Sequence, residues 1–530
     1  MGYVNRLSVI GMRISLPVVA RLGAARVALS CLTALVAGAI SIGARSAAAQ
    51  RPPNIVYIMA DDLGWAELGS YGQTKIHTPN LDQLARDGLR FTRFYSGSPV
   101  CAPSRAALLT GLHTGHAPVR GNFELGGYLD SEERGQYPLP AGTPTIATML
   151  KARGYATAIV GKWGLGGPGS EGVPNQHGFD FFYGYLDQKQ AHNHYPTHLW
   201  RNTQWDTLPN TYFSSHPAAE SIPADVRAFT QYQGTAYAPD VMTTESLRFI
   251  RQQRAKPFFL YLAFTLPHLA LQVPDEELAA YDFPETTYRA RQGYLPHARP
   301  RAAYAGMISR LDAHVGQVMA LLRELKLDST TLVVFTSDNG TTYTGGVEPG
   351  FFKSVANLRG LKDAVYEGGL RVPFIARWPG HIAPGRVTDA LAANWDVLPT
   401  LAALTHARVR GAIDGVSFAP TLLGRGVQPA HPPMYWEHHD VCAGQQAVRD
   451  GRWKAVRLGV AASRPAPVQL FDLDADPGER VDVAAQHPDV LARLERLMTT
   501  MRTPARIPEW NFVVNPARQV NYSTCAPGNR

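Results

Sequence analysis

Short apolar runs rich in β-branched and aromatic residues recur along the first three-quarters of the chain, and polar residues lie at or near the end of most of them. Runs of this length and composition are typical of buried strands. The pattern predicts five strands, at Asn54–Met59, Tyr155–Val160, Phe258–Phe264, Thr331–Thr336 and Val372–Ala376.

Between these runs, apolar positions recur with helical spacing. We expect helices at Asn80–Asp87, with Asn80 as its N-cap, at Thr145–Ala152, and from about Tyr304 to Leu325. Strands that alternate with helices predict an α/β fold with a large sheet, parallel or mixed, sandwiched by helices. Ligands bind outside the carboxyl ends of the strands in such sheets, so the polar residues there indicate one shared site.

The pattern changes near residue 425. Met434–His438, Gln446–Arg457 and Val468–Leu473 look like short antiparallel strands, with Asp450-Gly451 as a hairpin turn, and a helix is expected at Pro488–Met501. This predicts a smaller C-terminal α+β domain with an antiparallel sheet. We therefore expect a main domain at 50–425 and a C-terminal subdomain at 426–530.

The stretch Pro284–Pro300 is interrupted by Gly293 and Pro296. Glycine and proline at this density favour a surface loop over a helix or strand. We expect a loop here, and it is a candidate lid.

Residues 1–49 contain five arginines and no acidic residue, an apolar stretch at Val27–Ile42, and Ala47-Ala48-Ala49 before Gln50. This order is typical of a cleaved signal peptide. The alternative is an uncleaved membrane anchor, but the apolar stretch is shorter than the roughly 20 residues that span a bilayer. We expect a periplasmic or extracellular protein without stable membrane insertion.

The composition is that of a globular protein, with 45% apolar and 18% charged residues. The net charge of +8 falls to +3 without the five leader arginines. No run of Lys and Arg indicates a nucleic-acid patch, so we expect no nucleic-acid partner.

Of the four cysteines, Cys31 belongs to the leader. Export to an oxidising compartment favours a disulfide between Cys442 and Cys525. Cys101 is then the odd cysteine and requires its own explanation.

Cys101 opens the segment Cys-Ala-Pro-Ser-Arg, which Ala-Ala-Leu-Leu-Thr-Gly follows. Pro103 suits the first turn of a helix, so Cys101 is expected at a helix N-terminus, where free N–H groups favour an anion. From the residues alone, Cys101 is either a buried structural cysteine or a thiolate nucleophile.

The C-x-P-S-R segment with A-A-L-L-T-G resembles the signature of the type I, formylglycine-dependent sulfatases, an arylsulfatase-like family of the alkaline phosphatase superfamily. The resemblance runs from about Asn54 to Glu479 and includes ADDLGW, TPNLDQLARDGLRF, GKWGLG, TSDNG, YEGGLRVP and LFDLDADPGE in matching order. It implies that a maturase oxidises Cys101 to formylglycine and that 50–425 is the catalytic sulfatase domain.

The implied chemistry needs a hydrated aldehyde at residue 101. One of its two hydroxyls attacks sulfur and expels the alcohol or phenol. The second hydroxyl is then deprotonated, and its oxygen collapses to the aldehyde and releases sulfate. Serine and cysteine lack the second hydroxyl, so neither supports this release.

The resemblance implies a metal site at Asp61, Asp62, Asp338 and Asn339. These hard oxygen donors fit Ca²⁺, with Mg²⁺ as the alternative cofactor, and the ion would lower the nucleophile's pKa. Taken singly, each pair could instead cap a turn after a strand.

Four further residues complete the implied catalytic set around Cys101. Arg105 and Lys162 would hold the modified residue and the sulfate, and His268 and Lys362 would clamp sulfate oxygens. The alternative for His268 is a structural loop histidine.

One position departs from the family pattern. Many relatives read GKWHLG, and this histidine is the favoured base for sulfate release, whereas this chain has Gly164. We expect His192 or His194 to replace it. The same loop could instead bind substrate or be solvated.

Together these features predict a sulfuric ester hydrolase that cleaves aryl or carbohydrate sulfate monoesters. One alternative keeps the superfamily and changes the substrate, giving a phosphodiesterase or phosphonate monoester hydrolase. The other is a non-catalytic carbohydrate-binding relative.

Overall fold

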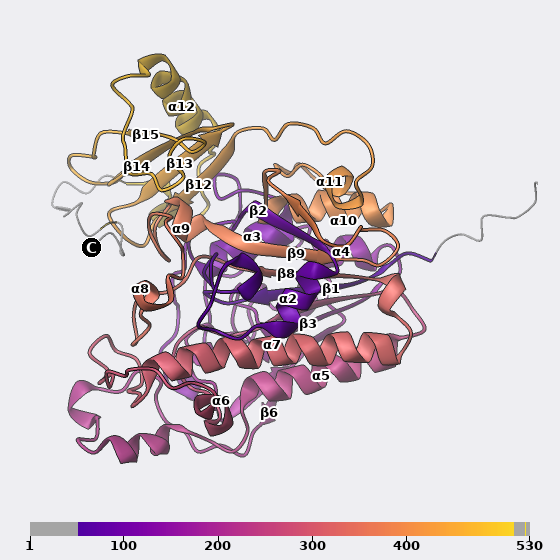
Figure 1. The fold of residues 1–530 in the computed structure, drawn as a ribbon, viewed down its shortest axis with the longest axis vertical. Helices are drawn as coiled ribbons and strands as arrows, with labels where there is room; N and C mark the ends of the chain where they lie inside the picture. Colours follow the sequence, from indigo (N-terminus) through magenta and orange to yellow (C-terminus); the bar gives the residue numbers. More distant parts are fainter. Residues whose placement is uncertain (1–50, 514–524, 526–530) are drawn as a thin grey trace, which may run out of the picture. The chain divides into compact units, whose positions relative to one another are not determined.

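The computed structural model describes residues 51–513 and residue 525, and Pro53–Arg530 form one compact unit (Figure 1). The expected signal peptide at 1–49, with Cys31, lies outside the described residues. Among the described residues, every helix is too short or too polar to cross a membrane.

A large mixed sheet forms the centre of the unit. Its strands are β1 (Asn54–Ala60), β2 (Leu89–Tyr95), β3 (Ala156–Lys162), β4 (Phe181–Tyr185), β5 (His198–Arg201), β6 (Gln204–Thr207), β7 (Phe258–Ala263), β8 (Thr331–Ser337), β9 (Arg371–Arg377), β10 (Arg386–Thr388) and β11 (Ala392–Ala393). The strand order is β10-β2-β9-β8-β1-β7-β3-β4-β5-β6, with β11 beside β2. The neighbours β8, β1, β7 and β3 run parallel, whereas β9 runs antiparallel to β8. The five predicted strands and the predicted fold class are confirmed.

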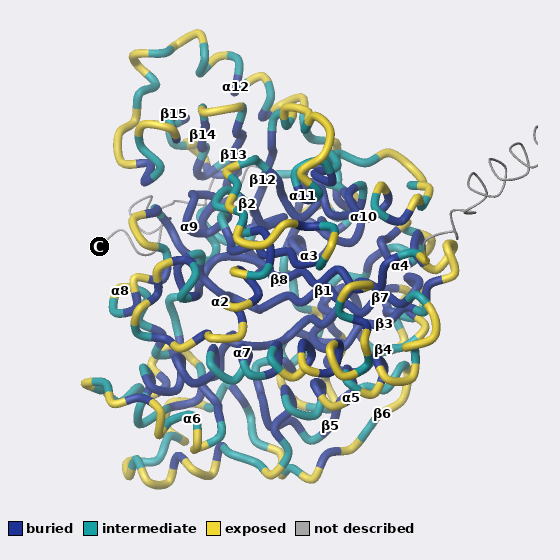
Figure 2. Tube along the Cα trace, turned by 45° about the vertical axis from the view of Figure 1, so that its right-hand side comes forward, coloured by how far each residue is buried: buried dark blue, intermediate teal, exposed yellow. Residues whose placement is uncertain are grey.

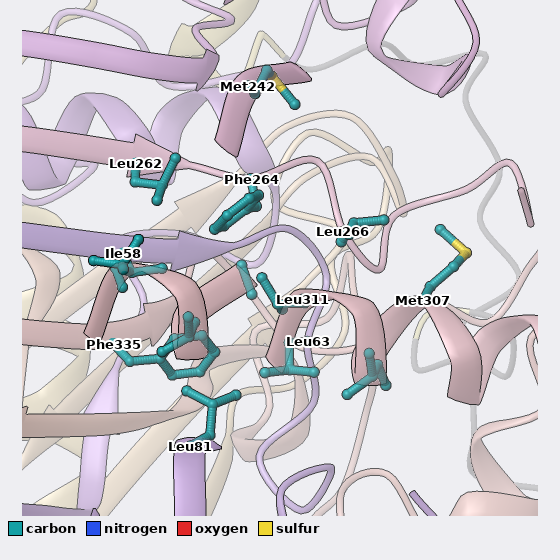
Figure 3. Close-up of a cluster of buried hydrophobic side chains, with 14 of the residues drawn as sticks. Ile58, Leu63, Leu81, Met242, Leu262, Phe264, Leu266, Met307, Leu311 and Phe335 are labelled. Carbon is teal, nitrogen blue, oxygen red and sulfur yellow. The ribbon is translucent and has the colours of Figure 1, made fainter. Parts of the chain in front are cut away.

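Helices cover both faces of this sheet. They are α2 (Pro79–Arg86), α3 (Cys101–Thr110), α4 (Ile146–Lys151), α5 (Ala238–Gln253), α6 (Asp275–Ala279), α7 (Pro300–Glu324), α8 (Pro349–Phe352), α9 (Glu367–Leu370), α10 (Val397–Thr405) and α11 (Ala419–Leu423). Because side chains alternate along a strand, β1 serves two cores. Val56 and Ile58 belong to the core with residues of α2, α5 and α7, and Figure 3 shows Ile58 in this core. Tyr57 and Met59 belong to the core with residues of α3, α4 and α10.

The predicted cap of the first helix is wrong. Helix α2 begins at Pro79, which has no N–H to satisfy, and Asn80 lies inside its first turn. The carboxylate of Asp312 on α7 accepts the Asn80 side-chain amide at 2.8 Å and the Leu81 N–H at 2.7 Å. The free donors of this helix are therefore satisfied by a residue more than 200 positions away.

A second, antiparallel sheet has the order β12 (Met434–His438), β13 (Gln445–Asp450), β14 (Trp453–Leu458), β15 (Gln469–Asp472). Helix α12 (Pro488–Thr500) packs on it through Leu494 and Met498. These elements match the predicted C-terminal pattern, and the predicted disulfide between Cys442 and Cys525 is present. The domain boundary at residue 425 remains a prediction.

A buried ionic group joins the two sheets. Lys454 on β14 lies 3.0 Å from Glu367 and 2.9 Å from Glu479, and all three are at most 1% exposed. Burial raises the pKa of Glu479 to about 7, although Lys454 opposes the shift. Glu367 and Glu479 come from the YEGGLRVP and LFDLDADPGE motifs, so these distant motifs meet at one lysine. Figure 2 shows that the central strands β1, β7 and β8 of the large sheet are buried, whereas its edge strand β6 is mostly exposed.

We predict that Lys454→Met destabilises the fold by about 3–5 kcal/mol, because it leaves two buried carboxylates without a cation. Glu479 has a raised pKa in the folded state, so its contribution to stability is lost as pH rises from its unfolded value of about 4.3 towards 7. Without Lys454 this loss grows, and the variant should be weakest at alkaline pH. Urea unfolding at pH 5.5 and pH 8 measures both effects.

The matched control is Arg452→Met on the same hairpin, which removes a half-exposed ion pair with Asp472. Such pairs contribute about 0–1 kcal/mol. Equal destabilisation by the two variants would contradict the role assigned to Lys454.

Candidate active site

Four adjacent strands bring the predicted polar residues to one edge of the large sheet. Asp61 and Asp62 follow β1, and Asp338 and Asn339 follow β8, its direct neighbour. Lys162 ends β3, and His268 lies in the segment after β7. All six are at most 3% exposed. The parallel topology therefore makes one buried polar site from segments up to 278 positions apart.

Cys101 is the first residue of α3, as the position of Pro103 predicted. Its Sγ lies 3.5 Å from Asp61 Oδ1 and 3.6 Å from Lys362 Nζ. Burial raises the pKa of the thiol well above its usual range, and the charges of Lys162 and Lys362 offset only part of that shift. The thiol is therefore neutral, unlike the low-pKa thiolates that act as nucleophiles.

Arg105 lies one turn further along α3 and is 1% exposed. Its guanidinium donates to Asp338 Oδ2 at 2.8 and 3.1 Å, lies 3.4 Å from Asp61 Oδ2, and donates to the carbonyl of Lys162 at 2.7 Å. The Lys162 ammonium lies 2.7 Å from Asp61 Oδ2. Both cations thus face the carboxylates. Burial by itself raises the pKa of Asp61, but Lys162, Arg105 and Lys362 lower it to about 2.

Asp62 lies on the other side of this group, with a left-handed backbone (φ 64°). Its carboxylate accepts Asn339 Nδ2 at 2.6 Å and Lys362 Nζ at 2.9 Å. His268 Nε2 lies 3.2 Å from Lys362 Nζ and 3.6 Å from Asp62 Oδ2. Burial raises the pKa of Asp62 to about 7, and the neighbouring carboxylates add to the rise.

These residues fit a hard divalent cation. Three carboxylates crowd one buried point, and Asn339 Oδ1 has no hydrogen-bond partner among the residues that the structure describes. The possible ligand atoms of Asp61, Asp62, Cys101 and His268 lie within 4.8 Å of one another, whereas Asp338, whose Oδ2 accepts from Arg105, is outside this group. The oxygen donors of Asp61, Asp62 and Asn339 favour Ca²⁺ or Mg²⁺ over zinc.

The two histidines proposed to replace the one missing at position 164 differ in their surroundings. His194 is fully buried, with Nε2 3.0 Å from the His268 carbonyl and Nδ1 3.2 Å from Thr265 Oγ1, so both ring nitrogens are engaged. His192 stacks on His268 with ring centroids 4.7 Å apart, and its Nδ1 lies 2.7 Å from His216 Nε2.

Sequence reasoning missed two aromatic rings beside the site. His216 and Tyr294 contact the His192 ring, with centroids 5.0 and 5.5 Å away. Tyr294 belongs to the predicted loop Pro284–Pro300, which is irregular apart from an isolated bridge between Tyr288 and His297 and ends at Pro300, the first residue of α7. No local pattern marks either residue, because long loops have no periodicity that reveals which side chains turn inward.

A second cluster, His113, His116 and Asp414, is not a metal site on these contacts. His113 Nδ1 accepts the Gly115 N–H at 3.2 Å, which puts the ring proton on Nε2, towards Asp414 at 3.6 Å. Asp414 also accepts the His113 N–H at 3.0 Å. The group therefore joins the loop after α3 to the loop after α10 through hydrogen bonds.

Comparison with known proteins identifies the family. Residues 53–407 match the family model described as Sulfatase, and residues 361–504 match N-sulphoglucosamine sulphohydrolase, C-terminal. Arylsulfatase A of Homo sapiens is 37% identical, over 85% of this chain and 88% of the relative. N-acetylgalactosamine-6-sulfatase of Homo sapiens is 32% identical, over 85% of this chain and 86% of the relative.

The crystal structure of Ps i-CgsB superposes with a TM-score of 0.71 at 28% identity, covering 87% of this chain and 95% of that one. The same protein is known in complex with k-i-k-neocarrahexaose. The matches run through both sheets of the compact unit. The chain therefore belongs to the sulfatase family.

Proposed function

We propose that the protein hydrolyses aryl or carbohydrate sulfate monoesters with a formylglycine made from Cys101. One observation carries this proposal. Cys101 is held at the N-terminus of α3 between a carboxylate, Asp61, and an ammonium, Lys362, with a thiol that burial keeps neutral. A neutral cysteine at a buried ionic centre is a poor nucleophile, whereas its oxidised form supplies hydroxyls for attack and a carbonyl for release.

In this proposal Lys362 and His268 bind the sulfate group. His268 donates Nδ1–H to the Leu269 carbonyl at 2.7 Å, so its Nε2 faces Lys362 and accepts from it. Burial and the charges of Lys362 and Lys162 lower the pKa of His268 well below its usual range. A bound sulfate group brings negative charge and favours a proton on Nε2, which can then donate to a sulfate oxygen.

Arg105 and Lys162 act mainly through the carboxylates. They neutralise Asp61 and Asp338, and Arg105 ties the end of β3 to α3 through the Lys162 carbonyl. A divalent cation, calcium by our proposal, would be held by Asp61, Asp62, Asp338 and Asn339. When bound, it supplies positive charge that lowers the nucleophile's pKa and offsets the sulfate charge.

We propose His192, rather than His194, as the base that replaces the histidine absent at Gly164. His194 uses one ring nitrogen as donor and the other as acceptor for structural contacts. Burial, followed by the charge of His268, lowers the pKa of His192 well below its usual range, so its ring is unprotonated in the free site. This shift weakens the ring as a base, and the negative charge of a bound sulfate group would raise the pKa again.

The proposed setting is an exported protein that meets a formylglycine-generating maturase. The leader at 1–49 and the disulfide between Cys442 and Cys525 support export, because structural disulfides persist in oxidising compartments. In this setting the loop Pro284–Pro300, which places Tyr294 against the site histidines, is the proposed lid.

The two alternatives differ from this proposal in measurable ways. A phosphodiesterase or phosphonate monoester hydrolase would turn over aryl phosphate diesters or phosphonates faster than aryl sulfates. A non-catalytic carbohydrate-binding relative would bind sulfated sugars without turnover. Membership of the sulfatase family and the 37% identity to an arylsulfatase favour sulfate esters as the substrate class.

We predict that the peptide containing Cys101 is about 18 Da lighter than its unmodified mass when a maturase is present. Cys101→Ala should lose more than about 1,000-fold of the sulfatase activity. Cys101→Ser should at best form a covalent sulfate ester without further turnover, because it lacks the second hydroxyl. Intact-protein mass spectrometry after incubation with an aryl sulfate distinguishes these states. Multiple turnover by Cys101→Ser at the wild-type rate would refute the formylglycine mechanism.

We predict one divalent cation per chain and a large loss of binding in Asp338→Ala. Metal analysis measures the stoichiometry, and the rise in unfolding temperature with added calcium measures affinity without relying on activity. Saturation at 100 times Kd stabilises the folded state by about 2.7 kcal/mol. Asp312→Asn, which changes a buried carboxylate on α7, is the control and should keep the metal. Full stoichiometry in Asp338→Ala would rule out this ligand set, and preferential stabilisation by magnesium would change the ion.

We predict that His192→Ala slows sulfate release more than the initial attack. Rapid mixing with an aryl sulfate should then show a burst of phenol followed by slow turnover. His194→Ala is the matched comparison, since it removes a neighbouring imidazole whose nitrogens are already engaged. A burst in His194→Ala alone, or full steady turnover in His192→Ala, would reverse this assignment.

A further inference from the structure

Gln188 occupies the space next to Gly164. A Cβ atom on residue 164 would lie 2.9 Å from Gln188 Cγ and 3.0 Å from Gln188 Cδ, and Gly164 has a left-handed backbone (φ 74°). Gln188 is 2% exposed, in the segment after β4. A side chain at position 164 and the present conformation of Gln188 are therefore mutually exclusive.

The Gln188 amide is linked to the start of α3. Asn122 Oδ1 accepts the Ala102 N–H at 3.1 Å and Gln188 Nε2 at 2.7 Å. The backbone N–H can only donate, so Asn122 must present its oxygen, and Gln188 must present its NH₂ group. Ala102 follows Cys101 directly, and its N–H is one of the free donors at this helix terminus.

Two further observations distinguish this arrangement from ordinary packing. The backbone N–H of Asn122 donates to Asp440 Oδ2 at 3.1 Å, which anchors the asparagine to the segment after β12. Gln188 Oε1 is buried and has no hydrogen-bond partner among the described residues. A buried acceptor without a donor is unfavourable, so a donor that appears only after modification or substrate binding would suit it.

We propose that Gln188 and Asn122 are positioning residues for residue 101, and that they replace the side chain absent at Gly164. This inference rests on the proposed function. Gln188 holds the Asn122 oxygen against the Ala102 N–H, and this orients the first turn of α3 and the formylglycine on it. Gln188 Oε1 remains available for a hydroxyl of that group. An amide cannot take the proton, so the base remains a separate residue.

The first test is Gln188→Met, which keeps the length of the side chain and removes the amide. We expect kcat for an aryl sulfate to fall about 10–100-fold, with KM within about two-fold and formylglycine occupancy unchanged. The control is Gln73→Met. Gln73 is a 9%-exposed glutamine whose amide donates to the carbonyls of Ala66 and Phe352, so its loss should lower stability without this change in kcat.

The second test is a double-mutant cycle. Gly164→His should lose activity because its side chain meets Gln188, and Gln188→Ala should lose activity because Asn122 is released. The double variant Gly164→His/Gln188→Ala lacks the contact with Gln188 and shares its backbone strain with Gly164→His, so its kcat should exceed that of Gly164→His by about ten-fold. Its pH–rate profile should gain a titrating group near the imidazole pKa.

These outcomes distinguish the positioning role of Gln188 and Asn122 from the proposed function. With formylglycine present, full kcat in Gln188→Met, or a loss no greater than in Gln73→Met, overturns the positioning role alone. A double variant no better than Gly164→His does the same. An active wild-type protein with unmodified Cys101 overturns the proposed function and, with it, this inference.

Discussion

The arrangement of the site depends on three carboxylates that are buried beside one another. Asp61, Asp62 and Asp338 are fully buried beside one another, and burying unpaired charges is prohibitively unfavourable. Arg105, Lys162 and Lys362 supply the compensation. Arg105 lies one turn after Cys101 on α3, so the helix that neutralises the carboxylates also carries the residue that we propose is modified. The neutralisation of the carboxylates and the position of Cys101 therefore both depend on helix α3.

The smaller sheet contacts and supports the segments that position Cys101. Trp436 on β12 donates to the carbonyl of Ser96 at 3.0 Å, in the segment that leads into α3. Asp440, just beyond β12, fixes Asn122, and Lys454 binds Glu367 near the strand β9 of the large sheet. Trp436, Asp440 and Lys454 all lie more than 300 residues after Cys101 in the chain. Their contacts fix segments that surround the start of α3. The second sheet is therefore part of the support for the active site.

The histidines around the site share one electrostatic environment. His192 and His268 are stacked, and burial together with nearby lysine charges lowers the pKa of both. Neutral imidazoles beside ammonium groups leave the positive charge on Lys362 and Lys162, where an anionic sulfate group would be attracted. Under the proposed function, the same imidazoles would exchange protons once a sulfate ester binds, because its charge favours their protonated forms.

Periodicity and local motifs were enough to predict the five central strands of the large sheet, several helices, a parallel or mixed sheet, the position of Cys101 and the oxygen donors at the sheet edge. They did not reveal the other strands of that sheet or the long helix α5. These features depend on short-range properties: alternation along a strand, proline in a first turn, polar residues after an apolar run. The tertiary structure decided what depends on contacts between distant segments. Asp312, not Asn80, satisfies the start of α2, and the contacts of His194 separate it from His192. Gln188 lies beside Gly164 only because the turn after β3 and the segment after β4 are brought together, and no one-dimensional pattern records which side chain fills the space beside a glycine.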